Sequence, residues 1–142
     1  NGLLANNVFL GTSLIDMYAK CGLLLKARGV LERLPVRNVV SWNTLISVYS
    51  QHNRGHEAFN CFIQMQGEGL SANEVTFASL LHACGTIGAI EKGRQIHDEI
   101  VSRCLLEKDI VLGNALVDMY AKCGFMEKAQ EFFQLLMHDV VA

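Results

Sequence analysis

The stretch Asp-Met-Tyr-Ala-Lys-Cys-Gly at residues 16–22 occurs a second time, without any change, at residues 118–124. The agreement extends outward, since Gly11 corresponds to Gly113 and Leu14 corresponds to Leu116. A duplicated segment of this length indicates a chain that is built from repeats. The fold therefore depends on what fills the sequence between the two copies.

Two further units of the same shape lie between these copies. With the first copy anchored at Val8 and the second at Ile110, one unit begins at Val39 as Val-Val-Ser-Trp-Asn-Thr-Leu-Ile, and another begins at Glu74 as Glu-Val-Thr-Phe-Ala-Ser-Leu-Leu. We number the four units in chain order: they span residues 8–38, 39–73, 74–109 and 110–139, and the middle two are longer than the outer two. Residues 1–7 then resemble the tail of a preceding unit, and residues 140–142 the start of a following one.

Each unit is expected to form two helices. Apolar residues recur at i, i+3 or i+4, and i+7 or i+8 in the first half of every unit, and a second apolar face follows in the other half. Helix stops are expected at Gly22, Gly85 and Gly124, and each first helix is preceded by an N-capping residue. These residues are Asn7, Asn38, Asn73, Asp109 and Asp139. One hairpin cannot bury both apolar faces, so the sequence predicts an all-α fold, an α-solenoid of stacked helix-turn-helix repeats.

The composition excludes several classes of protein. The 142 residues are 51% hydrophobic and contain no uninterrupted apolar run of about 18 residues, so no membrane span is expected. The five cysteines form no C-x-x-C pair, which argues against disulfides and for a reducing compartment. Cys and His residues are not clustered as a metal site requires, and no hydrolase, zinc-protease or phosphate-loop motif is present. We therefore expect no cofactor, no metal and no catalytic residues.

The motifs resemble those of pentatricopeptide repeat proteins, specifically the plant arrays that alternate three kinds of unit called P, L and S. The run at 39–46 is similar to the P kind, and the run Glu-Val-Thr-Phe-Ala-Ser-Leu-Leu-His-Ala-Cys-Gly at 74–85 is similar to the long L kind. Residues 112–124, Leu-Gly-Asn-Ala-Leu-Val-Asp-Met-Tyr-Ala-Lys-Cys-Gly, are similar to the short S kind. The resemblance implies the order S, P, L, S, after the tail of an L unit, and a right-handed superhelix.

The rival family on pattern alone is the tetratricopeptide repeat, a peptide-binding solenoid. Its period is a steady ~34 residues and its core is W-x₂-L-G-x₂-Y. Here the period alternates, and Ile46 takes the place of the motif glycine in the unit that contains Trp42. The pattern therefore favours the pentatricopeptide interpretation.

The resemblance implies which residues would read RNA bases. In that family the first helices line a groove that holds single-stranded RNA, and the fifth and last residues of a unit read one base. The fifth residues here are Thr12, Asn43, Ala78 and Asn114, and the last residues are Asn38, Asn73, Asp109 and Asp139. The pairs resemble an adenine reader in unit 1, a cytosine-preferring reader in unit 2 and a uracil reader in unit 4. Unit 3, with Ala78 and Asp109, is expected to be weak or non-coding, so the implied footprint is 5′-A-(C/U)-N-U-3′.

Other positions have both an RNA-binding and a structural interpretation. The last residues of the units are all Asn or Asp, as N-capping alone would require. The second residues, expected to sandwich bases, are Phe9, Val40, Val75 and Val111, and packing into the core is the alternative for each. Lys20 and Lys122 are expected to face phosphates, or to be solvated lysines favoured by the helix dipole.

The function implied is sequence-specific binding of single-stranded RNA in a mitochondrion or chloroplast, most often to choose sites for C-to-U editing. The complete signature of a zinc deaminase, H-x-E together with C-x-x-C, is absent from this sequence because no C-x-x-C is present. The net charge of −2 predicts weak binding by so few units. The alternative is a protein-interaction scaffold, through docking of accessory editing proteins at the L unit or through self-association.

Overall fold

The computed structural model describes residues 2–141, and side chains can be described for residues 7–138. This part of the chain forms eight α-helices and no strand. The helices are α1 (Gly2–Lys20), α2 (Leu24–Arg33), α3 (Val39–Gln51), α4 (Gly55–Gly67), α5 (Glu74–Ile87), α6 (Ile90–Ser102), α7 (Ile110–Lys122) and α8 (Met126–Val141).

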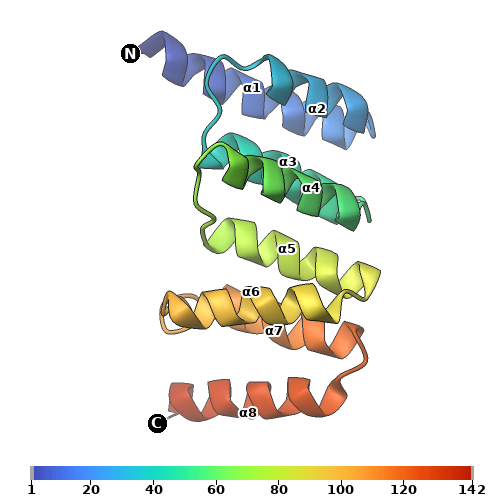
Figure 1. Ribbon diagram of the computed structural model, residues 1–142, viewed down its shortest axis with the longest axis vertical. Coiled ribbons are helices and arrows are strands. Elements are labelled where there is room, and N and C mark those ends of the chain that lie inside the picture. The colour runs from blue at the N-terminus through green and yellow to red at the C-terminus, as the bar shows by residue number, and fades with distance from the viewer. Residues whose placement is uncertain (1, 142) are drawn as a thin grey trace.

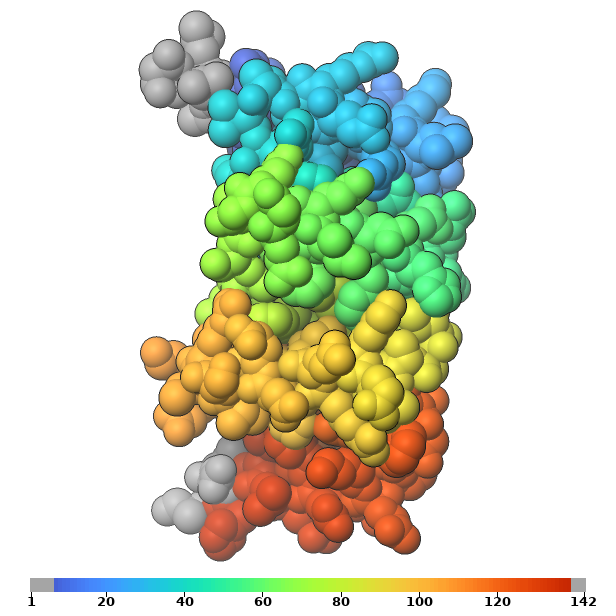
Figure 2. Space-filling view, in the orientation of Figure 1, coloured from blue at the N-terminus to red at the C-terminus, as the bar shows by residue number. Residues whose placement is uncertain are grey.

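The helices form four hairpins that stack along one axis, with the two chain ends at opposite ends of the stack (Figure 1). The first helices α1, α3, α5 and α7 pack against one another in chain order, and α2, α4 and α6 each pack against their own first helix and the next one. This is the α-solenoid that the repeats predict. Figure 2 shows the face that the second helices cover, with α4 in green above α6 in yellow.

Side-chain caps fix the start of the inner first helices. Oδ1 of Asn38 accepts a 2.9 Å hydrogen bond from the backbone N–H of Ser41, and Oδ1 of Asp109 accepts one of 2.9 Å from Val111. Asn73 caps α5 in the same way. Because a cap satisfies N–H groups that have no partner within the helix, α3, α5 and α7 begin at the residues directly after these caps.

The structure corrects three expected helix ends. Gly85 is buried inside α5, and the helix ends instead at Ile87, followed by the capping residue Gly88, whose φ of 69° is the left-handed conformation that glycine adopts freely. Asn7 lies within α1 and Asp139 within α8, so neither is an N-cap. Neither Gly nor Pro interrupts residues 3–10 or 126–141, and the helical hydrogen bonds continue through both positions.

The core is continuous along the stack and consists mainly of the predicted apolar positions. Leu45, Ile46, Leu80, Leu81 and Leu116 are all completely buried. Leu10 and Leu14, which belong to the same pattern in unit 1, are 61% and 40% exposed. Both lie on α1, which among the described helices packs against α2 and α3 and has no other first helix beside it.

Candidate nucleic-acid interface

The second residue of every unit is an exposed apolar side chain. Phe9, Val40, Val75 and Val111 are 70%, 61%, 53% and 59% exposed, respectively. Val40, Val75 and Val111 each lie in the first turn of a first helix, at the same register along the stack. The expected alternative, that these side chains pack into the core, is therefore wrong for Val40 and Val75, whose helices have first helices on both sides.

A groove of about 350 Å³ runs along α3, from Val40 near its start to Gln51 at its end, and reaches the start of α5, on the side of the first helices. Its lining includes Val40 and Val75, the second residues of consecutive units, and Asn43 and Asn73, the fifth and last residues of unit 2. The remaining lining residues are Asp16, Thr44, Ser47, Val48 and Gln51. Four residues that the resemblance assigned to one base site are thus brought together by the fold.

Asn43 and Asn73 are in direct contact. Nδ2 of Asn43 donates a 2.9 Å hydrogen bond to Oδ1 of Asn73, and Oδ1 of Asn43 accepts a 2.5 Å hydrogen bond from the hydroxyl of Thr76. Oδ1 of Asn73 also accepts from the backbone N–H groups of Val75 and Thr76, at 3.1 Å and 3.3 Å. Asn73 therefore caps α5 and holds the side chain of Asn43 at the same time.

The other expected pairs are not joined in this way. In unit 1, the hydroxyl of Thr12 donates to the carbonyl of Phe9 at 2.8 Å, while Asn38 forms a reciprocal capping box with Ser41. In unit 4, Asn114 is exposed, and the side chain of its partner Asp139 lies outside the described residues.

Unit 3 has no pair of polar side chains at these positions. Ala78 is half-buried and packs against the core, and Asp109 caps α7. An alanine side chain has no hydrogen-bonding atom, so it cannot read the edge of a base.

The two expected phosphate-binding lysines lie at the C-terminal ends of α1 and α7. Both side chains are exposed. Nζ of Lys122 pairs with Oδ2 of Asp118 at 2.9 Å, and its aliphatic stem covers Gly85 of the neighbouring α5. The carboxylate partly compensates the charge that Lys122 would offer to a phosphate. This i, i+4 pair could have been predicted from the sequence.

Serine and threonine hydroxyls between neighbouring first helices were not predicted. The hydroxyls of Ser47 and Ser79 are 2.7 Å apart, and Ser50 donates a 2.8 Å hydrogen bond to the carbonyl of Ser79. Together with Thr76 they form a polar seam between α3 and α5, beside the groove. The sequence signal that could have indicated this seam is the presence of these hydroxyl residues within the apolar runs of the first helices.

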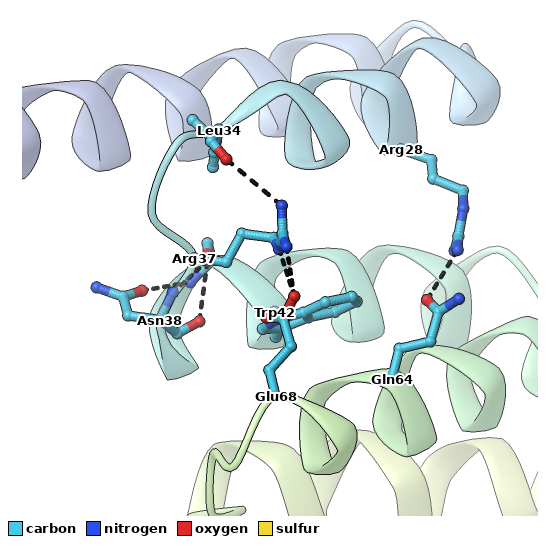
Figure 3. Close-up of polar contacts among 8 residues, drawn as sticks. Arg28, Leu34, Arg37, Asn38, Trp42, Gln64 and Glu68 are labelled. Carbon is cyan, nitrogen blue, oxygen red and sulfur yellow. Dashed lines mark hydrogen bonds and ion pairs between the residues drawn. The ribbon is translucent and has the colours of Figure 1, made fainter.

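Polar contacts on the opposite face hold consecutive units at a fixed spacing (Figure 3). Nε of Arg37 donates a 2.8 Å hydrogen bond to Oε2 of Glu68, and Arg28 on α2 donates one of 2.8 Å to Oε1 of Gln64 on α4. The bond from Arg37 holds the pKa of Glu68 below its ordinary value. These contacts link unit 1 to unit 2 on the face opposite the first-helix groove.

Other kinds of site find no support in the part of the chain that the structure describes. Residues 2–141 contain no helix with the length and hydropathy needed to cross a membrane. The side chains described include no group of three His, Cys, Asp or Glu residues that could hold a metal ion.

The stacked hairpins define a helical-repeat protein of the α-solenoid class. Two family models identify which kind: the PPR repeat family matches residues 37–86, and the PPR repeat matches residues 12–39 and 114–139. These matches cover most of the chain, so the chain belongs to the pentatricopeptide repeat family.

Several curated proteins of Arabidopsis thaliana are similar to this chain. The pentatricopeptide repeat-containing protein At2g13600 is 39% identical over 138 residues, which are 96% of this chain and 20% of that protein. The mitochondrial protein At3g09040 is 40% identical over 92% of this chain and 13% of its own length, and the chloroplastic protein At1g08070 is 43% identical over 94% and 18%. The chain thus spans about a fifth or less of these relatives. The mitochondrial and chloroplastic locations in the names of At3g09040 and At1g08070 agree with the expected setting.

Solved structures share the fold. The crystal structure of PPR10 in complex with an 18-nt psaJ RNA element superposes with a TM-score of 0.77 at 19% identity, over 95% of this chain and 20% of that one. The crystal structure of PPR10 from maize gives a TM-score of 0.68 at 24% identity, over 90% and 19%. At this level of identity the likeness supports the solenoid fold.

Proposed function

We propose that this chain is a segment of a repeat array that binds single-stranded RNA with sequence preference, about one base per unit. The observation that carries the proposal is the groove in which Val40 and Val75 flank the Asn43–Asn73 pair. Exposed apolar side chains on both sides of a pair of amides provide surfaces for a flat base and hydrogen-bonding groups for its edge. PPR10, which has the same fold, has been crystallised in complex with an RNA element.

The order of the units gives the footprint 5′-A-(C/U)-N-U-3′. Unit 1 would read adenine through Thr12 and Asn38, and unit 2 a pyrimidine through Asn43 and Asn73. Unit 4 would read uracil through Asn114 and Asp139. We assign no base to unit 3, because Ala78 has no polar atom in its side chain.

A small number of units should bind RNA weakly. The sequence carries a net charge of −2, and Lys122 shares its charge with Asp118. Affinity for RNA depends strongly on neutralising phosphates, so it has to accumulate over more units than these four. We infer that these units contribute mainly to the choice of sequence.

The role that follows is the selection of sites for organellar RNA processing, C-to-U editing in particular. The relatives named mitochondrial and chloroplastic support an organellar setting. The four units would act as a recognition module without catalytic residues.

A second candidate function is docking of a protein, such as an accessory editing factor, at unit 3. A groove of about 360 Å³ lies between α4 and α6 on the second-helix face. Its lining includes Phe59, Phe62, Ile96 and Ile63, and the last of these is 63% exposed. Apolar side chains gathered on a surface favour association, with a partner or with another copy of the array.

The test of RNA reading is a change of base preference at unit 4. In the full-length protein, Asn114→Thr should shift the preference at the fourth base of the footprint from U towards G, as measured by binding of labelled RNAs at low salt. Asn114 is exposed, so the substitution should leave the fold intact. Asn60→Thr, the same change at an exposed position of α4, is the matched control and should change nothing. If neither protein discriminates bases but a protein partner binds, the docking function replaces RNA reading.

A further inference from the structure

We propose that Thr76 determines the base preference of unit 2, although it belongs to unit 3 and does not itself line the groove. It would do so by holding the oxygen of Asn43 away from the base, so that the pair presents N–H donors. The side chain of Thr76 is completely buried, directly behind Asn43 and Asn73. This inference rests on the RNA-binding function proposed above.

The hydrogen bonds assign every amide orientation without ambiguity. The backbone N–H groups of Val75 and Thr76 can only donate, so the atom of Asn73 that faces them is its oxygen. The side chain of Asn43 must then donate to that same oxygen, and its Nδ2 lies 2.9 Å away. The amides of both residues are therefore oriented by the backbone of α5.

The proton of the Thr76 hydroxyl is assigned by the same reasoning. Its oxygen accepts a 3.1 Å hydrogen bond from the backbone N–H of Asn73. Its hydrogen points to the nearer of two acceptors, Oδ1 of Asn43 at 2.5 Å, while Oδ1 of Asn73 is 3.2 Å away. The oxygen of Asn43 is thus held by a buried donor, and Asn43 is only 6% exposed.

The pair is left with donors for a base. Nδ2 of Asn73 has no hydrogen-bond partner among the residues that the structure describes, and Nδ2 of Asn43 uses one of its two hydrogens. N3 and O2 of cytosine are both acceptors, whereas N3 of uracil carries a hydrogen and repels a donor. A donor-only site therefore favours cytosine. Uracil can accept from such a site through O2 or O4, but its N3–H finds an acceptor there only if the Asn43 oxygen turns towards the groove.

The other units of this chain provide an internal comparison. The residue equivalent to Thr76 is Ser41 in unit 2, and its hydroxyl contacts only the backbone of Asn38, at 2.9 Å to N and to O. In unit 4 the equivalent residue is Leu112, and it follows the unit whose fifth residue is Ala78. Of these three residues, only Thr76 has a hydroxyl that reaches the fifth residue of the preceding unit. That fifth residue, Asn43, is an amide whose oxygen can accept the hydrogen bond.

The experiment compares C with U at the second base of the footprint, using the full-length protein and otherwise identical RNAs. The variants are Thr76→Val, which removes the hydroxyl but keeps the shape, and Thr76→Ser, which keeps the hydroxyl. The quantity measured is the ratio of the two Kd values on one protein preparation. A loss of folded protein changes both constants alike and cancels in this ratio.

We expect Thr76→Val to reduce the preference for C over U by about fivefold, the effect of one buried hydrogen bond, and Thr76→Ser to retain the preference. Ser41→Ala, a matched removal of a hydroxyl at the start of α3, should leave the preference for A at the first base unchanged. An unchanged ratio in Thr76→Val, or a reduced ratio in Thr76→Ser, overturns the role of Thr76. If the unmodified protein does not distinguish C from U at this position, the RNA-reading function itself fails. That result is distinguishable from the two results that overturn only the role of Thr76.

Discussion

Nε1 of Trp42 donates a 2.7 Å hydrogen bond to Oε1 of Glu68, and so links the start of α3 to the end of α4. The other oxygen of the same carboxylate accepts from Arg37, in the loop that enters α3 (Figure 3). One exposed carboxylate therefore holds both the first helix of unit 2 and the preceding connection. Trp42 is the single tryptophan of the sequence and is 4% exposed, so its fluorescence reports on this contact.

Glu68→Gln should lower the free energy of unfolding at pH 7 by about 0.5–1 kcal/mol, because an exposed ion pair contributes little. The hydrogen bond from Arg37 depresses the pKa of Glu68 in the folded protein. The contribution of Glu68 to the free energy of unfolding is therefore complete above the pKa of the carboxyl in the unfolded chain, about 4.3. It is lost as the pH falls through the lower pKa of the folded protein. Denaturation followed by Trp42 fluorescence at pH 7 and pH 3 measures the difference.

Glu107→Gln is the matched control for this substitution, since Glu107 is exposed and has no ion pair among the described residues. It should change stability little at either pH. A difference between Glu68→Gln and the unmodified protein that persists below both pKa values contradicts the assigned role of the carboxylate.

Gly55→Ala should destabilise the protein by about 1–3 kcal/mol, as overpacking of a tight site does. A Cβ at residue 55 would lie 2.8 Å from Cγ2 of Ile87 and 3.3 Å from the backbone oxygen of Ala83. In Gly29→Ala, the control within α2, the new Cβ meets nothing within 4 Å and should stabilise the helix by up to about 1 kcal/mol. The midpoint temperature of thermal denaturation should therefore fall for Gly55→Ala and rise for Gly29→Ala. A shift in the same direction for both variants contradicts the packing of Gly55 against α5.

Four of the five cysteines should react with a thiol reagent in two groups, exposed and buried. Cys21 and Cys104 are exposed, whereas burial raises the pKa of Cys61 to about 11 and that of Cys84 to about 12. Because the thiolate is the reactive form, Cys61 and Cys84 should react near neutral pH only after unfolding. Mass spectrometry of partly labelled native protein identifies the modified sites. Rapid labelling of Cys61 in the native protein would contradict the burial of this side chain on α4.

Val75→Ala should weaken binding to all RNAs of matching length by a similar factor, about two- to fivefold, because a base loses apolar contact but no base-edge hydrogen bond is removed. Val101→Ala is the control, since Val101 on α6 is also 53% exposed but lies outside the groove. Titration of each variant with RNAs that differ at the second base measures both affinity and preference. A change of base preference in Val75→Ala would mean that Val75 also reads the base edge.

Much of the fold could be predicted from the sequence because its determinants are local. The starts of α3, α5 and α7 follow from Asn38, Asn73 and Asp109, since a cap acts on N–H groups two or three residues away. The core of the stack follows from apolar residues that recur with the period of a helix. The wrong expectations at Asn7, Gly85 and Asp139 came from residues that favour a helix end but do not enforce one.

The candidate site could be predicted only as a set of positions. The resemblance of the sequence to the family predicted that Asn43, Asn73, Val40 and Val75 belong to one site. The fold places all four side chains in one groove. It did not predict that Thr76 donates to Asn43, or that Ser47 meets Ser79 between α3 and α5. These contacts join residues about thirty positions apart, in different units.

The sequence by itself determined the repeat and the helical hairpins, because each depends on a period or on a neighbour within one turn. The positions assigned to the groove came from the family resemblance. Only the tertiary structure decided which polar atoms of those positions remain available to a ligand. That depends on how closely two first helices pack, since the approach of α5 to α3 brings the hydroxyl of Thr76 to the oxygen of Asn43 and leaves the N–H groups for a base.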